Sequence, residues 1–459
     1  MTAIKNMLGK LYIRDKAFYK MVLGIAIPIA LQSLITTGVN MMDTLMISSL
    51  GETQLSAVSL ANQFIMIYQG CCMGIGMGAS VLVSRYHGMK EMKAIHKTVA
   101  IMLRICLGIA IIFCLITLCI PGRIMRIYSL DTAIIEQGKI YLKWSVVTYF
   151  LLGLSLTSTL ILRSVGKTKM PLYTSIGAFF MNVGANYIFI FGKLGAPRME
   201  IAGAALGTLI ARLFEFSIIC GYLLFVDKEI GFRIKHIFMK TGSLWKEYMK
   251  ISLPVVISDL IFMVGNNAVA MVIGRLGQSF VAANAVTTMT QQLSSVLTAG
   301  TAQAAAIVTG HALGEGRIDK AKKQGYALLG MGIAFGMLTS FIIFVISTPM
   351  IESYHVSEET AALAQQLMDA ISITVLFQAI NSIMTKGTLR GGGDTKMLMI
   401  TDNIFLWILS LPLGLLAGFV FHLPAFWIYI FLKADQIAKA VWCVFRLKSG
   451  KWIKKIAAA

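Results

Sequence analysis

Charged side chains are scarce in this chain. Of its 459 residues only 14% are Asp, Glu, Lys or Arg, whereas 57% are hydrophobic. Soluble globular proteins carry about 25% charged residues, so this deficit argues against a surface that faces water. The alternative solvent is lipid, in which a spanning helix needs about 20 mainly apolar residues. The composition therefore predicts an all-α polytopic membrane protein.

Motifs for cofactors, metals and catalysis are missing as well. The seven cysteines are scattered through apolar stretches without C-x-x-C spacing, which predicts free thiols. The sequence VGKT at 165–168 looks like part of a P-loop, but Ile161 stands where that motif needs its first glycine. The clustered acids that a membrane prenyl transferase needs for metal-bound pyrophosphate are absent too. We therefore expect no enzyme and no cofactor, with energy supplied by an ion gradient.

Positive charge is in excess, with 41 Lys and Arg against 21 Asp and Glu. In a soluble protein this balance would suggest nucleic acid as a partner. Here the basic side chains gather in alternate short loops, as at Lys93, Arg163, Lys322, Lys386 and Arg390, and the intervening loops hold few. The positive-inside rule then predicts a bacterial inner (plasma) membrane protein with both termini in the cytoplasm and no nucleic-acid partner.

About twelve apolar segments follow one another along the chain. Several exceed the minimum for one crossing, so we expect tilted or extended helices. The segments lie near 20–49, 54–84, 98–120, 133–162, 170–191, 199–226, 245–274, 279–310, 324–347, 359–388, 397–420 and 423–445.

The second half of the chain repeats the first. Pro28 falls on Pro254, and the offset stays at about 226 or 227 residues. Six spans in each half give the halves the same orientation, so we predict two six-helix bundles related by a pseudo-twofold axis along the membrane normal. We place the amino-terminal lobe at 1–230 and the carboxy-terminal lobe at 231–459. The aligned stretches are 25–51 with 251–277 and 162–170 with 389–397.

Two acids lie within equivalent predicted spans, Asp43 in the first and Asp259 in the seventh. A charge at the bilayer centre costs about 2.5–3.5 kcal/mol on insertion scales, so each acid is a candidate functional group. Asp43 aligns with Val269, and Asp259 with Ser33. Ten residues of helix correspond to about 15 Å, so the halves have diverged in function on one scaffold.

Asn182 and Asn186 are four residues apart in the fifth predicted span and share one helical face. Together with Asp43 and Thr208 they offer an oxygen-rich cluster that suits a proton or a hard cation such as Na⁺. The alternative is a purely structural hydrogen-bond network between helices.

Methionine is abundant, with 28 residues. Met41 and Met46 flank Asp43, and Met263 lies near Asp259. Flexible, polarisable side chains suit a cavity that accepts many shapes, although lipid-facing or core positions explain them equally well.

Other polar groups favour structural roles or stay open. Arg212 and Glu215 are three residues apart and are expected to neutralise each other. The roles of Asp369 and Asp402, near span ends, are left open. Three further groups on the twelfth span, Lys433, Asp435 and Lys439, suggest a local charge network. On span 2, Gly70, Gly74 and Gly78 form two consecutive GxxxG units that predict close helix packing.

Three stretches resemble the multidrug and toxic compound extrusion (MATE) family: MMDTLMISSLGETQLSAVSLA (41–61), FGKLGAPRMEIAGAALGT (191–208) and LRGGGDTK (389–396). The resemblance covers nearly the whole chain. It implies a twelve-helix, two-lobed, V-shaped fold and Na⁺ or H⁺ antiport of cationic, amphipathic compounds.

Residue by residue, Asp43 matches the family's amino-lobe acid, and Asn182, Asn186 and Thr208 match the polar positions around it. The carboxy-lobe acids of the NorM-type branch are not reproduced, because they would fall at Phe262 and Ala379. Asp259 lies nearly one turn from the first of these positions. The resemblance therefore favours an ion site around Asp43.

The preferred interpretation is a secondary active multidrug efflux antiporter that acts as a monomer and exchanges small-molecule drugs or toxic metabolites for H⁺ or Na⁺ across the lipid bilayer. The alternative is a lipid-linked oligosaccharide flippase of a related fold. Such a flippase is expected to line its cavity with basic residues, whereas interior positive charges predicted here are few, mainly Arg104 and Arg212.

Overall fold

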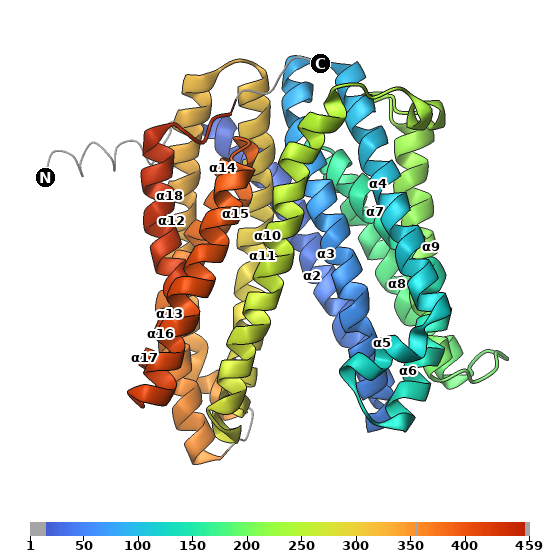
Figure 1. The fold of residues 1–459 in the computed structure, drawn as a ribbon, viewed down its shortest axis with the longest axis vertical. Helices are drawn as coiled ribbons and strands as arrows, with labels where there is room; N and C mark the ends of the chain where they lie inside the picture. The colour runs from blue at the N-terminus through green and yellow to red at the C-terminus, as the bar shows by residue number, and fades with distance from the viewer. Residues whose placement is uncertain (1–14, 354–356, 455–459) are drawn as a thin grey trace, which may run out of the picture. The chain divides into compact units, whose positions relative to one another are not determined.

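The structure is a computed structural model that describes residues 15–353 and 357–454, and within these residues helices joined by short connections make up the fold, with no β-strand. Figure 1 shows the long helices running roughly side by side within each part of the chain. The predicted all-α membrane architecture is confirmed. Both chain ends, whose cytoplasmic location is predicted, lie outside the described residues.

Ten helices in the described ranges are long and apolar enough to cross a membrane. They are α2 (Lys16–Ser48), α3 (Glu52–Met89), α4 (Met92–Cys119), α7 (Val146–Ser164), α8 (Lys169–Phe191), α9 (Ile201–Gly221) with η1 (Tyr222–Val226), α10 (Leu244–Arg275), α12 (Ile318–Ser353), α13 (Glu358–Asn381) with η3 (Ser382–Thr388) and α14 (Leu389–Gly391), and α15 (Thr395–Ile404) with η4 (Phe405–Ser410), α16 (Leu411–Leu415) and η5 (Leu416–Val420).

The two other predicted spans are helical too. Span 8 is α11 (Gln278–Gly314), and span 12 is divided by Lys433 into α17 (Ala425–Leu432) and α18 (Ala434–Ser449). Shorter helices complete the described chain, namely α5 (Pro121–Tyr128), α6 (Thr132–Trp144) and η2 (Ile234–Phe238).

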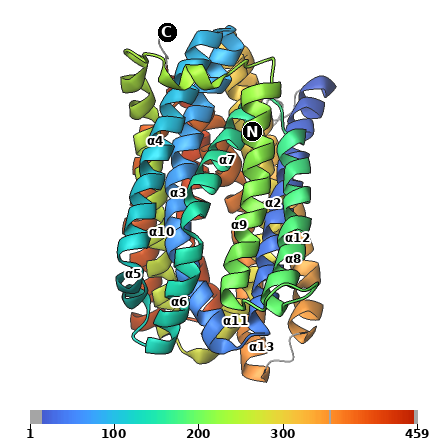
Figure 2. The same cartoon turned by 90° about the vertical axis from the view of Figure 1, so that its right-hand side faces the viewer.

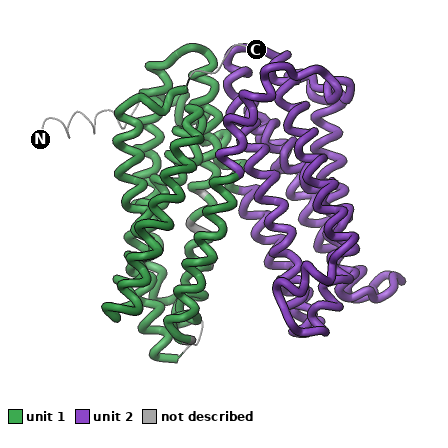
Figure 3. The backbone as a smooth tube through the Cα atoms, viewed as in Figure 1, with its two compact units in different colours: residues 1–30, 257–458 green, residues 31–256, 459 purple. Residues whose placement is uncertain are grey.

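The chain forms two compact units (Figure 3). Unit 1 comprises residues 1–30 and 257–458, and unit 2 comprises residues 31–256 and 459. The predicted lobes, 1–230 and 231–459, follow the sequence repeat and stay a prediction. Grouping by contacts differs from them because α2 and α10 each contribute one end to unit 1 and the other end to unit 2.

In unit 1, the first half of α2 packs into the core of the carboxy-terminal helices. Phe18, Val22 and Ile29 are buried in one cluster with Ala304 of α11 and Leu328 of α12. Between spanning helices such contacts are stabilised by van der Waals packing, because lipid tails are as apolar as the side chains themselves. The start of the chain is therefore an integral part of this unit.

In unit 2, two glycines of α3 let it approach the start of α10. A Cβ on Gly74 would lie 2.9 Å from Val256 Cα, and one on Gly78 would lie 2.7 Å from Ser252 Cα. A Cβ on Gly70 would meet nothing within 4 Å. The predicted close packing is confirmed at Gly74 and Gly78 and is wrong at Gly70.

The lysine of the P-loop-like VGKT sequence has a structural partner. Lys167 pairs with Asp227, whose carboxylate is buried, and with Glu229 at 3.2 Å. Burial acts to lower the pKa of Lys167, but the hydrogen bonds and charges of Asp227 and Glu229 outweigh it and raise this pKa above its ordinary value. The pair contributes stability below the unfolded pKa of 10.5, and that contribution is lost only as the pH rises through the folded pKa.

Candidate functional site

The amino-terminal candidates come together in unit 2. Asp43 extends from α2 toward α8, where Asn186 Nδ2 donates a hydrogen bond to Asp43 Oδ1 at 2.5 Å. The same amide nitrogen lies 3.4 Å from Asn182 Oδ1. Both asparagines are buried, whereas Asp43 is partly exposed. The spacing of four residues on α8 places both amides on the face that meets Asp43.

A glycine on the neighbouring helix, because it has no side chain, leaves room for the side-chain amide of Asn186. Figure 2 shows α8 and α9 side by side, and a Cβ added to Gly207 of α9 would lie 2.0 Å from Asn186 Oδ1. This oxygen is buried and has no hydrogen-bond partner in the described structure. The amide is therefore anchored through its nitrogen, and its oxygen is left available.

A second layer of polar groups surrounds Asp43. The Tyr141 hydroxyl lies near Thr208 and interacts electrostatically with Asp43 and Arg212. It also donates a hydrogen bond to Asn62 Oδ1 at 3.3 Å. Tyr141 and Asn62 lie on α6 and α3, and neither was predicted, because no sequence spacing connects these helices to Asp43.

Arg212 and Glu215 form the predicted ion pair on α9, with Nη1 and Oε2 2.7 Å apart. Arg212 also interacts electrostatically with Asp43. Asp43 is therefore influenced by a positive charge that is already shared with Glu215, and it is not locked to a basic partner of its own.

The cluster as it stands is arranged for a bare carboxylate, because an N–H group faces Asp43. Protonation of Asp43 would remove the charge that attracts this N–H. A half-turn of the Asn186 amide would instead direct Oδ1 toward Asp43 and create an oxygen-lined position for a hard cation. The described residues contain no group of three or more His, Cys, Asp or Glu that could hold a metal ion. Amide and hydroxyl oxygens would thus supply most of the ligands.

The carboxy-terminal candidates, Asp259 and Met263, belong to unit 1. Asp259 Oδ1 lies 3.8 Å from Arg390 Nη2. Of the methionines near Asp43, Met41 is exposed and Met46 packs against the core of unit 2. Of the two explanations offered for the methionines, a flexible cavity or a lipid-facing or core position, the core position applies to Met46.

The predicted loop placement is wrong for three basic residues, of which Arg163 is buried within α7. Lys386 and Arg390 were expected in a cytoplasmic loop, but α13 continues through η3 and α14 to Gly391 and makes both residues helical. Arg390 is also buried. Interior positive charges are therefore more numerous than Arg104 and Arg212, and the paucity of such charges no longer argues against an anionic ligand.

Lys439 connects the acids of the last helices. It is buried and pairs with Asp402 at 3.3 Å and with Asp435 at 3.1 Å, which confirms a charge network on α18 that also includes Asp402 of α15. Asp369, by contrast, accepts a hydrogen bond from Gln365 at 3.1 Å on its own helix.

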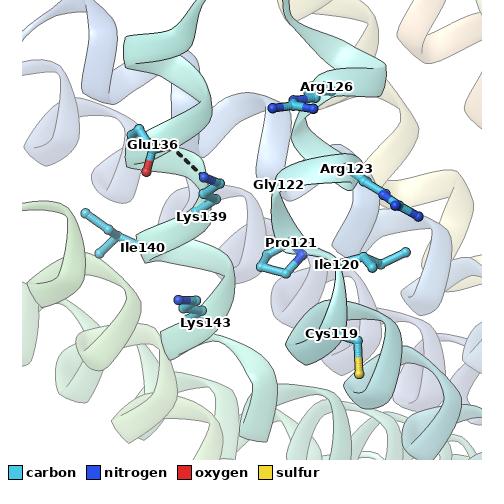
Figure 4. A pocket seen from close by; sticks show the side chains of 10 residues that line it. All are labelled: Cys119, Ile120, Pro121, Gly122, Arg123, Arg126, Glu136, Lys139, Ile140 and Lys143. Atoms are coloured by element: carbon cyan, nitrogen blue, oxygen red, sulfur yellow. Dashed lines mark hydrogen bonds and ion pairs between the residues drawn. The ribbon is translucent and has the colours of Figure 1, made fainter.

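A surface pocket of about 570 Å³ lies between α5 and α6 of unit 2, apart from all predicted site residues (Figure 4). Four of its ten lining residues are basic, and one of them, Lys139, is paired with Glu136 at 2.6 Å. The lining residues are Cys119, Ile120, Pro121, Gly122, Arg123, Arg126, Glu136, Lys139, Ile140 and Lys143.

Comparison with known proteins identifies the family. The family model MatE matches residues 28–188 and 254–416, the two halves of the repeat. The chain belongs to the MATE family of transporters. It is similar to the uncharacterized transporter YisQ of Bacillus subtilis, at 26% identity over 90% of each chain. It is also similar to the probable multidrug resistance protein NorM of Thermotoga maritima, at 25% identity over 95% of this MATE chain and 93% of the relative.

Solved structures support the same fold. A mutant of the Vibrio cholerae MATE transporter VcmN matches with a TM-score of 0.86 at 17% identity, covering 94% of this chain and 97% of the other. The protein is thus a multi-pass membrane transporter with the MATE fold.

Proposed function

We propose that this MATE protein is a multidrug efflux antiporter that exports cationic or amphipathic small molecules in exchange for H⁺ or Na⁺. It would act as a monomer by alternating access in the bacterial inner membrane. Relatives named as multidrug resistance proteins support the substrate class. The hydrogen bond between Asp43 and Asn186, inside predicted spans, is the single observation that supports ion coupling most directly.

In the proposed cycle, Asp43 alternates between a bare carboxylate and a form occupied by a proton or Na⁺. The bare form attracts the Asn186 N–H and connects α2 with α8, whereas the occupied form loses this attraction. A ligand shifts a conformational equilibrium only by its differential affinity for the two states. Occupancy of Asp43 would supply that difference.

Transport by purified protein in proteoliposomes tests this proposal. H⁺ and Na⁺ gradients are imposed separately, and efflux of a fluorescent cationic dye is recorded. We expect Asp43→Asn to lower gradient-driven efflux by at least about tenfold, because an amide cannot cycle between charged and occupied forms. Glu136→Gln, an acid of unit 2 outside the Asp43 cluster, serves as the control and should transport normally.

The gradient that drives efflux in the unchanged protein identifies the coupling ion. Full gradient-driven efflux by Asp43→Asn, with normal amounts in the membrane, would disprove coupling at Asp43 whichever ion is used.

A lipid-linked oligosaccharide flippase remains the alternative function, favoured by the buried positive charges of unit 1. Deletion of the gene distinguishes the two. Drug sensitivity without a cell-wall defect supports efflux, and a cell-wall defect without drug sensitivity supports the flippase.

A further inference from the structure

The repeat provides an internal comparison for one buried arginine. Arg163 in LRSVGKTKM and Arg390 in LRGGGDTKM occupy the same position of the two halves. Arg163 Nη2 donates a hydrogen bond to Gln32 Oε1 at 2.5 Å, and Gln32 Nε2 donates to Ser175 Oγ at 2.8 Å. In unit 2 the arginine therefore has a side-chain partner supplied by α2.

In unit 1 that partner is missing. The position of Gln32 corresponds to Ser258 on α10, whose side chain lacks the amide. The Arg390 side chain makes no hydrogen bond to any described residue, although only 5% of the residue is exposed. Asp259 is the acid paired with it, and the 3.8 Å separation is too long for a hydrogen bond.

A buried guanidinium without hydrogen bonds is an unusual arrangement. Arginine carries five N–H donors and stays charged, so burial removes hydration that the protein must replace. Buried polar groups in native structures have partners in the protein, in water or in a ligand. Arg390 Nη2 comes no closer than 3.8 Å to Asp259 Oδ1, and Nε has no partner among the described residues, so an external acceptor is the natural complement.

The surroundings of Arg390 carry more positive than negative charge. Lys386, one turn earlier, interacts electrostatically with Arg390, Asp259, Asp402 and Lys439, and it has no ion pair within the described chain. Lys433 and Asp435 interact with Lys439, and with them this group of residues contains four cations and three carboxylates. Since Lys439 already pairs with Asp402 and Asp435, the unmatched charge lies on the other cations.

An aromatic ring completes the surroundings. Lys439 Nζ lies 4.9 Å from the centre of the Phe262 ring on α10. Phe262 is partly exposed and is followed by the partly exposed Met263. A ligand that reaches this cluster therefore meets an apolar surface as well as a positive charge.

We propose that Arg390 and Lys386 form a binding site for the carboxylate or phosphate group of an amphipathic molecule. The planar guanidinium fits such groups through two parallel hydrogen bonds. Asp259 is the carboxylate now paired with Arg390, at 3.8 Å, and 35% of its side chain is exposed. The incoming anion takes its place beside the guanidinium. The site does not depend on ion-coupled antiport, so its occupancy can be measured without any gradient.

Binding to the full-length protein in phosphatidylcholine nanodiscs tests the proposal. Two probes share one ring system and differ in charge, namely 1-naphthoate and 1-naphthylmethylammonium, and their affinities are measured by calorimetry. We expect naphthoate to bind more tightly, and Arg390→Gln and Lys386→Gln each to weaken it by roughly tenfold or more. Lys320→Gln removes one positive charge of unit 1 outside the cluster and should leave naphthoate affinity unchanged.

Asp259→Asn keeps the test informative if Arg390→Gln does not fold. Removal of the competing carboxylate should strengthen naphthoate binding, a gain that a merely structural Asp259 would not produce. Equal binding of both probes, or unchanged naphthoate affinity in both Lys386→Gln and Asp259→Asn, would overturn the proposal.

The source of the anion is resolved by adding phosphatidylglycerol to the nanodiscs. Competition with naphthoate that disappears in Lys386→Gln identifies a lipid headgroup as the occupant. Unchanged naphthoate affinity identifies a free amphipathic acid. Both results support an anion site, whereas competition that persists in Lys386→Gln places the lipid elsewhere and contradicts it.

Discussion

Gly207 determines where the Asn186 amide can lie. A methyl group at position 207 would overlap the amide oxygen at 2.0 Å, so Gly207→Ala must displace Asn186 from Asp43. We expect a loss of about 1–3 kcal/mol of stability, typical of overpacking, together with impaired coupled efflux. Thermal unfolding in detergent and the proteoliposome assay measure the two effects.

Gly221→Ala is the matched control on the same helix, because a Cβ there would meet nothing within 4 Å. Its unfolding temperature and efflux should equal those of the unchanged protein. If Gly207→Ala behaved like Gly221→Ala, the amide would not be held as described.

Asp43, Asn182 and Asn186 were predictable from sequence because burying a polar group in an apolar span is costly and because four residues make one helical turn. Their mutual contact is found as predicted, while their role stays a proposal. Tyr141 was not predictable, because its contact depends on the packing of separate helices. Arg390 was missed because a charge at the end of an apolar run suggests a loop.

Helix η3 shows why the predicted loop is helical. Its Gly387, and Gly391 one turn later, would bring a Cβ within 2.7 Å and 2.6 Å of the carbonyl oxygens of Ala302 and Ala306 on α11. Close backbone approach at small residues stabilises helix pairs in membranes. Hydropathy alone does not register this packing, so the sequence places the end of the helix too early.

The glycines of α3 allow a test of the same principle in unit 2. In Gly78→Ala the new Cβ would lie 2.7 Å from Ser252 Cα, so α3 and the start of α10 must separate. We expect thermal unfolding at a lower temperature, by the equivalent of about 1–3 kcal/mol.

Gly70→Ala, two turns away on α3, is the control. It meets nothing within 4 Å and gains helix propensity of up to about 1 kcal/mol, so it should be neutral or stabilising. A Gly78→Ala variant as stable as Gly70→Ala would show that this helix contact is loose.

At the scale of the whole molecule, hydropathy and the repeat were sufficient to predict the helical segments, and the three stretches that resemble the MATE family predicted its fold. They were not sufficient to predict the two compact units, because α2 and α10 each change unit within a helix, near Pro28 and Pro254. A repeat reports ancestry along the chain, whereas a unit is defined by which side chains pack together.

Fusion proteins test the membrane orientation. The alternation of basic loops predicts that the connection near residue 240 faces the cytoplasm and the one near residue 129 faces outward. Truncated chains fused after these positions to alkaline phosphatase should be active only at 129, and fusions to green fluorescent protein should fluoresce only at 240. The reverse pattern would invert the predicted topology.

The order in which the ribosome makes the chain separates the two units in time. Almost all of unit 2 has been synthesised once residue 256 has emerged. Ile29 of unit 1, by contrast, is buried against Ala304 and Leu328. Ala304 and Leu328 are synthesised roughly 300 residues after Ile29, a delay of about 15–60 s at 5–20 residues per second. During that interval, lipid or the insertion machinery must cover the apolar face of the nascent first helix.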